Sequence, residues 1–259
     1  AGIFGMAAGA AAYPTLVRLH HERRTAEAYT LLTQAAKTTL LLAFISQALL
    51  SVVGADAVHL VWGFSNRRFS AEDVDGIAEC LSYFALALAA WSLHPLLARG
   101  FYARGNTWLP TALGTVVTVL VVPLYVAMRH VAGTSGLALA SSIALVAYVV
   151  PLHVALRRAV RKDLGDGADL PGWRGFIARG VAVFAGTFVV LYALRAGLGL
   201  VVRGDGPVAC FVRIAAVAAA ALPVALVTAR MLGMEEAHGL AERVVGVTRR
   251  TWSKLRPTA

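Results

Sequence analysis

Residues 96–110 read LLARGFYARGNTWLP, a short polar stretch with a long apolar segment on each side. Each flanking segment reaches the roughly 20 residues that an α-helix needs to cross a bilayer. A soluble domain could not carry so much uninterrupted apolar sequence, because it would have no polar face to show to water. The chain is therefore predicted to be an integral membrane protein, with this stretch as a polar hinge between two spans. The hinge residues are Arg99, Phe101, Tyr102, Arg104, Asn106 and Pro110.

The composition concentrates the charges between the apolar runs. The 259 residues are 58% hydrophobic and only 15% charged, with a mean hydropathy of +0.69. The formal net charge of +10 is typical of a membrane protein whose cytoplasmic loops collect Lys and Arg beside anionic lipid. Nucleic acid is not a predicted partner, since no basic stripe carries the interleaved aromatic residues that base stacking requires.

Seven apolar runs predict an all-α, polytopic membrane helix bundle. They cover residues 2–17, 29–54, 76–98, 108–128, 133–156, 174–200 and 208–232. Residues 55–75 are predicted to form a solvated loop, and Arg129-His130 a short turn. The proline of His94-Pro95 predicts a kink near the end of the third span, because it removes a backbone hydrogen bond. His94 itself is either a proton carrier or, more often for such a residue, a hydrogen-bond partner of nearby backbone.

The start of the chain indicates a longer protein. It opens with AGIFGMAAGA, without an initiator Met, and its first apolar run is slightly short for a span. We therefore expect the chain to begin inside a helix. Gly5 and Gly9 form a GxxxG pair, a spacing that lets a neighbouring helix approach closely. A stretch so rich in Ala and Gly also produces this spacing by chance.

The chain is predicted to have four parts. Residues 1–158 form a partial lobe with five spans, residues 159–173 a basic linker, residues 174–232 two further spans, and residues 233–259 a basic tail. The tail carries apolar residues near helical spacing, which predicts an amphipathic helix on an anionic leaflet. Most Lys and Arg fall on the same side of the membrane as this tail. The positive-inside rule then places the hinge, the linker and the C-terminus in the cytoplasm.

The motifs of common enzymes are missing. The sequence holds no HExxH, no GxSxG and no P-loop, and its acidic residues are interpreted as loop residues, so neither catalysis nor a cofactor is predicted. His20-His21-Glu22 is a poor metal site, because adjacent residues project in different directions around a helix. Lys37 lies inside the second predicted span, where an ammonium is costly. It either reaches back to the interface or faces a wet cavity.

Several segments resemble one transporter family. FYARGNTWLP at 101–110 resembles the "FYALxDTxTP" signature of the MurJ/MviN lipid II flippases, within the multidrug/oligosaccharidyl-lipid/polysaccharide exporter superfamily. GIFGMAAGAAAYPTL at 2–16 is similar to that family's "GVxGVALxTxLxPxLS" helix, and GLALASSIA at 136–144 to its "HAGLALATSLA" helix. PGW at 171–173 also precedes two further helices, as it can in the family. This collinear order implies that the seven spans correspond to the eighth through fourteenth helices of a fourteen-helix flippase.

The resemblance implies a function. It implies that lipid II, an undecaprenyl-linked peptidoglycan precursor, is moved across the bacterial inner membrane by alternating access, driven by membrane potential or a coupling ion of unknown identity. The family's diphosphate-binding arginines would lie upstream of Ala1, in an N-terminal lobe that is the implied partner of this one. Two alternatives remain open. The protein could move another polyprenyl-linked oligosaccharide, of the O-antigen or capsule type, or it could be a scaffold in cell-wall synthesis that transports nothing.

Few functional residues carry over from the resemblance. Arg18 and Lys37 match basic positions that would attract the substrate headgroup. The implied groove for the lipid tail involves the last two spans, and its candidate residues are Phe176, Phe184, Phe188 and Tyr192. Their spacings of eight, four and four put them on one helical stripe, which is more often a packing surface. Asn106 stands where the family often has Asp, and a structural role in the turn is the favoured interpretation.

Overall fold

The computed structural model describes residues 2–63, 70–165, 172–202, 206–234 and 236–237, and these residues form helices without strands. The elements are α1 (Gly2–His21), α2 (Thr25–Val58), the π-helical turn η1 (His59–Gly63), α3 (Ala71–Leu86), α4 (Leu88–Ala103), α5 (Trp108–Leu164), α6 (Arg174–Val201) and α7 (Pro207–Met231). Four helices in the described residues are long and apolar enough to cross a membrane, or five if α3 and α4 form one span. The prediction of an all-α membrane bundle is confirmed.

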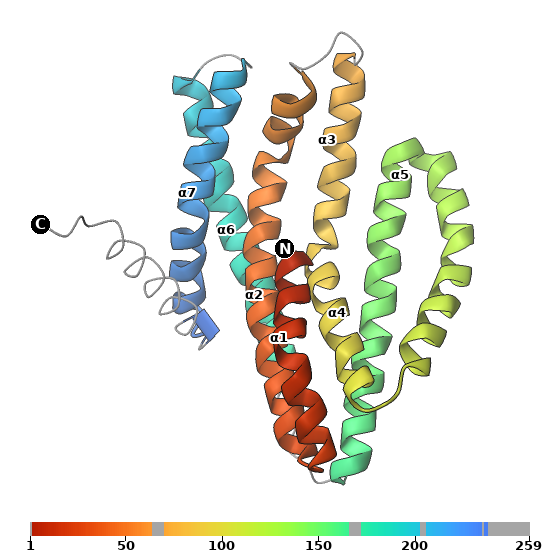
Figure 1. Ribbon diagram of the computed structural model, residues 1–259. Helices are drawn as coiled ribbons and strands as arrows, with labels where there is room; N and C mark the ends of the chain where they lie inside the picture. Colours follow the sequence, from red (N-terminus) through yellow and green to blue (C-terminus); the bar gives the residue numbers. More distant parts are fainter. Residues whose placement is uncertain (1, 64–69, 166–171, 203–205, 235, 238–259) are drawn as a thin grey trace, which may run out of the picture.

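Helix α2 is the central element of the bundle (Figure 1). It packs against every other α-helix, whereas α6 and α7 contact the rest of the described bundle only through α2 and η1. Its buried positions include Leu40, Leu41 and Ala43, which point in different directions around the helix as expected of a span enclosed by protein. Helices α6 and α7 therefore form a pair attached to the flank of a five-helix body.

The third predicted span is a bent pair of helices. Helices α3 and α4 meet at Ala87 at an angle of 46°. This bend lies eight residues before Pro95, which lies inside α4, so the span breaks at a place that the sequence did not indicate. Side chains from neighbouring helices bind the carbonyl groups at this break: Ser142 donates to the Tyr83 carbonyl at 2.8 Å, and Gln47 to the Leu86 carbonyl at 3.4 Å. Such insertion into the backbone ladder is a known cause of helix bending.

The fourth and fifth predicted spans form the two limbs of α5, which reverses direction at Ala132 and Gly133 (Figure 1). Gly133 has a positive φ of 56°, which glycine adopts without strain. The turn predicted at Arg129-His130 is wrong by a few residues, because both still belong to the first limb. A Cβ at Gly136 would overlap the Met128 carbonyl, so the two limbs can approach this closely beside the turn only because this position has no side chain.

Three segments predicted as connections are partly helical. Residues 96–103 of the hinge belong to α4 and residues 108–110 to α5, which leaves only residues 104–107 as a connection. Phe101 is 1% exposed and lies in the core. Residues 55–58 continue α2, and α3 already begins at Ala71, where Ser70 and Asp73 form a capping box. Residues 159–164 of the predicted linker also belong to α5.

The close helix approach predicted for Gly5 and Gly9 is confirmed. A Cβ at Gly5 would overlap the backbone of Ser92 in α4, and a Cβ at Gly9 would overlap the guanidinium of Arg99. Arg99 Nη1 in turn donates to the Met6 carbonyl at 2.6 Å. The small residues thus let α1 lie against α4, and Arg99 fastens the two helices together.

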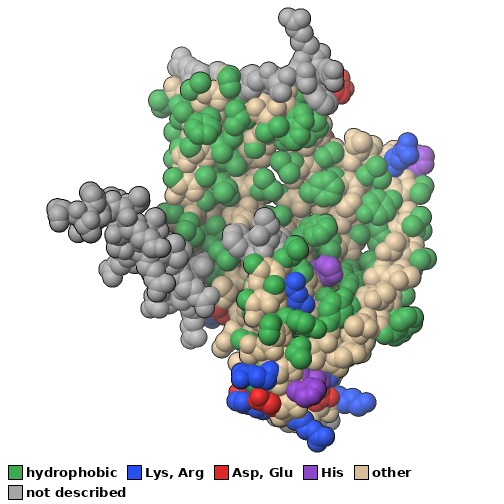
Figure 2. All heavy atoms as spheres, in the orientation of Figure 1, with side chains coloured by type: hydrophobic (Ala, Val, Ile, Leu, Met, Phe, Trp, Pro, Cys, Tyr) green, Lys and Arg blue, Asp and Glu red, His purple; other side chains and the backbone are tan. Residues whose placement is uncertain are grey.

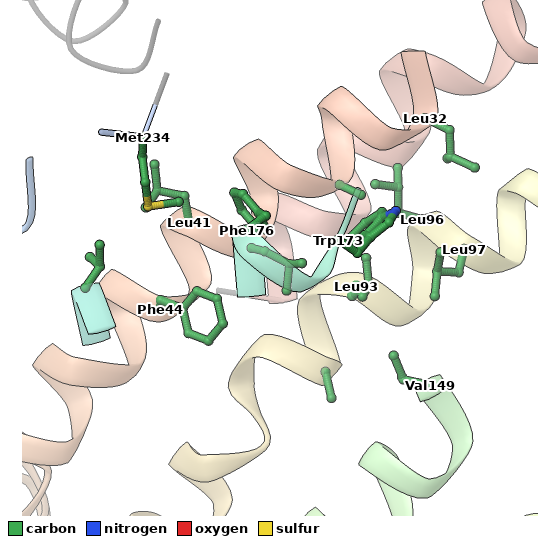
Figure 3. Packing of buried hydrophobic residues seen from close by; sticks show 14 of the residues in the cluster. Leu32, Leu41, Phe44, Leu93, Leu96, Leu97, Val149, Trp173, Phe176 and Met234 are labelled. Atoms are coloured by element: carbon green, nitrogen blue, oxygen red, sulfur yellow. The ribbon is translucent and has the colours of Figure 1, made fainter. Parts of the chain in front are cut away.

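The main hydrophobic core lies where α2, α4, α5 and α6 converge (Figure 3). Leu93, Leu96 and Leu97 of α4 pack there with Leu41 of α2. The segment after α7 also contributes: Gly233 turns the chain with a φ of 63°, and Met234 and Ala237 are buried in this core. The tail predicted for 233–259 is described only at 233, 234, 236 and 237, and its amphipathic helix lies outside the described residues.

The outer surface separates apolar from charged side chains. Figure 2 shows a broad hydrophobic flank and a group of charged side chains at the lower end. On the first limb of α5, Val119, Leu120 and Val126 are all more than half exposed, as expected of side chains that face lipid. We call the lower part of the bundle, which holds the ends of α1, α4 and α5 and the starts of α2 and α6, the basic end (Figure 1).

Candidate functional site

A polar cavity lies beside the connection between α4 and α5. Its volume is about 560 Å³, and its lining residues are His94, Tyr102, Pro110, Thr111, Gly114, Thr115, Thr118, Val119 and Tyr148. The hydroxyl of Tyr148 donates to the Pro110 carbonyl at 3.1 Å, and its ring lies edge-on to that of His94, 5.1 Å away. The three threonines donate their hydroxyls to their own helix. Their oxygens can therefore still accept hydrogen bonds inside the cavity.

The two arginines of the predicted hinge bind neighbouring helices. Arg99 binds α1, as described above. Arg104 Nη2 forms an ion pair with Asp163 at 2.8 Å and a longer hydrogen bond to the Ala159 carbonyl, which ties the end of α4 to the end of α5. Both guanidinium groups thus have partners within the protein. Their role in this structure is to position helices.

The connection itself is built from residues suited to a turn. Gly105 has a φ of 72°, a conformation that favours glycine. The side-chain oxygen of Asn106 accepts from the Leu109 N–H at 3.1 Å and so caps the first turn of α5. Pro110 sits in that first turn, where its missing N–H is tolerated. This hydrogen bond gives Asn106 the structural role in the turn that its sequence context favours.

Lys37 and Phe176, two of the predicted site residues, lie together. The ammonium of Lys37 is 3.3 Å from Glu236 Oε1 and 5.5 Å from the centre of the Phe176 ring. Phe176 is buried in the main core. Lys37 lies three turns inside α2, yet it meets a carboxylate from the segment after α7. The carboxylate and the ring offset the cost of this charge in an apolar setting.

This contact can be measured with a double-mutant cycle. Lys37→Met and Glu236→Gln, alone and combined in the native protein, are expected to give a coupling energy of about 1 kcal/mol in the free energy of unfolding. The pair is only partly exposed, so either single change leaves a half-buried charge without its partner. Unfolding of the four proteins in detergent measures the coupling, and a value near zero would contradict the contact.

The other predicted aromatic residues form a ladder along α6. The ring of Phe184 stacks on that of Phe188 at 6.1 Å, and Phe188 on Tyr192 at 5.9 Å. Phe184 and Phe188 are half-buried against the core, whereas Tyr192 is 56% exposed. The stripe predicted from the spacing therefore exists, and it presents one exposed edge. Phe176 differs from Phe184, Phe188 and Tyr192 because its side chain is buried inside the protein.

Arg18 lies in the last turn of α1 at the basic end, with its side chain 68% exposed. The nearest carboxylate in an ion pair is that of Glu22, at 4.0 Å, so the guanidinium remains accessible. In the following turn, hydrogen bonds to Glu27 and Glu22 raise the pKa of the Arg24 guanidinium. Arg24 is therefore engaged with acidic residues, while Arg18 projects outward.

A charged network that was not predicted from the sequence lies near the other end of the bundle. Asp56 in α2 is 3% exposed and accepts from Arg195 Nε of α6 at 2.5 Å, and its other oxygen lies 3.3 Å from Arg213 Nη2 of α7. The interpretation of the acidic residues as loop residues was wrong for Asp56. Each of the three residues interrupts an apolar run, and that pattern was the available signal. The network joins the α6–α7 pair to α2.

Comparison with known proteins identifies the family. The family model described as "MurJ: Lipid II flippase MurJ" matches residues 1–204. Among solved structures, "Lipid II flippase MurJ, inward closed conformation" matches with a TM-score of 0.64 at 17% sequence identity. The alignment covers 93% of this chain and 44% of that one, so the chain spans less than half the length of that structure. A search among curated proteins finds no match. Since the family model covers most of the chain and the helical fold agrees, this chain belongs to the MurJ lipid II flippase family.

Proposed function

We propose that the protein containing this chain flips lipid II across the bacterial inner membrane during peptidoglycan biosynthesis. The observation that carries this proposal is the family match over residues 1–204. A transporter of this kind needs helices that cross the bilayer, polar groups that face a cavity and a body able to move as a unit. The membrane-length helices and the polar cavity of the α2-centred bundle support this proposal for one lobe.

The mechanism we propose is alternating access, in which this lobe rocks against an N-terminal lobe. The core shared by α2, α4 and α5 and the ties of Arg99 and Arg104 favour motion of these helices as one body. Closely packed cores resist continuous deformation, so a change of access is expected to occur at the surface between lobes. The driving force would be the membrane potential or a coupling ion.

The substrate contacts of this lobe would be few. Arg18 projects from the basic end, where it could attract a diphosphate headgroup. Lys37 could do so only if Glu236 moved away. The exposed edge of the aromatic ladder, at Tyr192 and the half-buried Phe188, offers an apolar surface for the polyprenyl tail. Packing against another helix of the full protein remains the alternative role for this edge.

We also propose that the basic end faces the cytoplasm, and labelling of introduced cysteines tests this orientation. Arg158 lies at the basic end, Arg129 lies near the turn of α5 at the opposite end of the bundle, and both are exposed. In a cysteine-free background, Arg129→Cys is expected to react with a membrane-impermeant maleimide in intact spheroplasts, and Arg158→Cys only after permeabilisation. The reverse pattern would overturn the orientation.

Depletion of the native protein in its own cells tests the transport function. Lipid II is expected to accumulate and to stay inaccessible to a probe added at the outer face of spheroplasts. Failure of lipid II to accumulate, with accumulation of a different lipid-linked oligosaccharide, would instead identify a flippase of the O-antigen or capsule type. For the scaffold alternative, purified full-length protein would bind cell-wall enzymes but leave lipid II on its original leaflet in vesicles.

A further inference from the structure

A second cavity, separate from the polar cavity beside the α4–α5 connection, lies at the basic end between the end of α5 and the start of α6. Its volume is about 960 Å³. The backbones of α5 and α6 do not approach each other closely within the described residues, and the cavity occupies the space between them. The residues that matter for its chemistry are His153, Arg157, Arg158, Arg161, Trp173 and Arg174.

Four of these residues are arginines, and they give the cavity a strong positive charge. Arg158, Arg161 and Arg174 are exposed and Arg157 is half-buried. Across the described ranges, none of the four forms an ion pair within 4.0 Å, in contrast to Arg104 and Arg24 nearby. Asp166 and Asp169 follow in the sequence but lie outside the described residues. A guanidinium cluster of this kind fits an anion with several oxygen atoms, such as a phosphate group.

The N-terminus of α6 adds to this attraction. Trp173, the residue before the helix, provides no side-chain cap, and the first helical hydrogen bond runs from the Ile177 N–H to the Trp173 carbonyl. Within the described residues, the N–H groups of the preceding first-turn residues are therefore available to an acceptor. The 28-residue helix also places the positive end of its dipole here. Phosphate groups bind at helix N-termini for these two reasons.

The wall of the cavity away from the arginines is apolar. Val154 of α5 and Ile177 of α6 line it, and both are exposed. One turn further into the bundle, Val150 and Val181 are each more than half exposed. Trp173, buried with its ring 4.5 Å from that of His153, marks the level where the polar and apolar parts meet. The surface therefore changes from cationic to apolar along the direction in which a lipid lies.

We propose that this cavity binds an anionic phospholipid of the surrounding leaflet, with the phosphate among the arginines and the acyl chains along Val150, Val154, Ile177 and Val181. Basic pockets between transmembrane helices are suited to such headgroups. A bound lipid would fill the space between α5 and α6 and so join the α6–α7 pair to the five-helix body at the basic end. This site differs from the aromatic ladder in position and in charge.

Lipid titration of the purified native protein, followed by native mass spectrometry, tests the proposal. Phosphatidylglycerol is expected to bind more tightly than phosphatidylcholine, and the triple change Arg158→Gln, Arg161→Gln and Arg174→Gln is expected to weaken phosphatidylglycerol binding roughly tenfold or more. The matched control is the pair Lys162→Gln and Arg230→Gln, which removes exposed positive charge outside the cavity. Equal weakening by the control, or none by the triple change, would overturn the site.

Two further measurements, a phosphate competition and a pair of single substitutions, help to interpret the binding result. Inorganic phosphate, added as competitor, is expected to displace phosphatidylglycerol poorly, because it gains nothing from the apolar wall. Displacement at low millimolar concentration would mean a phosphate site without a lipid and would overturn the proposed occupant. Should the triple variant aggregate, Arg158→Gln and Arg161→Gln are measured singly, and each is expected to weaken binding by several-fold.

Discussion

Replacing Asp56 with alanine in the native protein is expected to lower the free energy of unfolding by roughly 3–5 kcal/mol. The carboxylate is 3% exposed and meets Arg195 and Arg213 from two other helices. Its removal leaves two guanidinium groups close together without the charge that lies between them. Unfolding in mixed detergent micelles, followed by circular dichroism, measures the loss.

A matched acidic residue provides the control for this experiment. Asp75 pairs with His59 at 3.2 Å, but its side chain is 72% exposed, so Asp75→Asn is expected to change stability by less than about 1 kcal/mol. Combining Asp56→Leu with Arg195→Met and Arg213→Met should recover much of the loss, because an apolar replacement of the whole network removes the unpaired charges. Equal effects of Asp56→Ala and Asp75→Asn would contradict the buried network.

Replacing Gly5 with alanine is expected to cost roughly 1–3 kcal/mol, the range found for overpacked sites. The added methyl group would overlap the backbone of Ser92, which cannot rotate away as a side chain can. Helices α1 and α4 would have to separate, and the hydrogen bond from Arg99 to the Met6 carbonyl would weaken. Detergent unfolding measures the stability, and hydrogen exchange is expected to be faster in α1.

Gly197→Ala is the matched control for this substitution. Gly197 lies inside α6, and a Cβ there would meet no atom within 4 Å. Alanine is the better helix former, so the control is expected to be neutral or to stabilise by up to about 1 kcal/mol. If Gly5→Ala behaves like Gly197→Ala, the close packing of α1 on α4 is not present in the native protein.

The sequence predicts the helices well because the bilayer imposes a strong constraint on composition. Apolar runs must be helical to satisfy their backbone groups, and this fixes the spans from α2 to α7 within several residues. The prediction failed where polar residues were assumed to mark loops. The predicted second span ended at residue 54, two residues before Asp56, although the charge of Asp56 is compensated by residues far away in the chain. Periodicity holds no information about such distant partners.

The same reason explains the errors at the hinge. Arg99 and Arg104 suggested a polar connection, whereas the structure uses them to join α4 to α1 and α5. For the candidate site, the aromatic ladder followed from spacing alone, since residues four apart share one face of a helix. The Glu236 partner of Lys37 could not be found in this way, because it depends on the turn at Gly233 that brings the chain back.

The pairing of Asp56 also has a consequence for the time course of synthesis. Asp56 and Arg195 are 139 residues apart in the chain. At a translation rate of 5–20 residues per second, the carboxylate leaves the ribosome roughly 7–28 s before Arg195. During that interval the far end of α2 carries an uncompensated charge, which favours its contact with water or with the insertion machinery. Its final burial is therefore expected to be a late event, completed only when α6 and α7 have entered the membrane beside it.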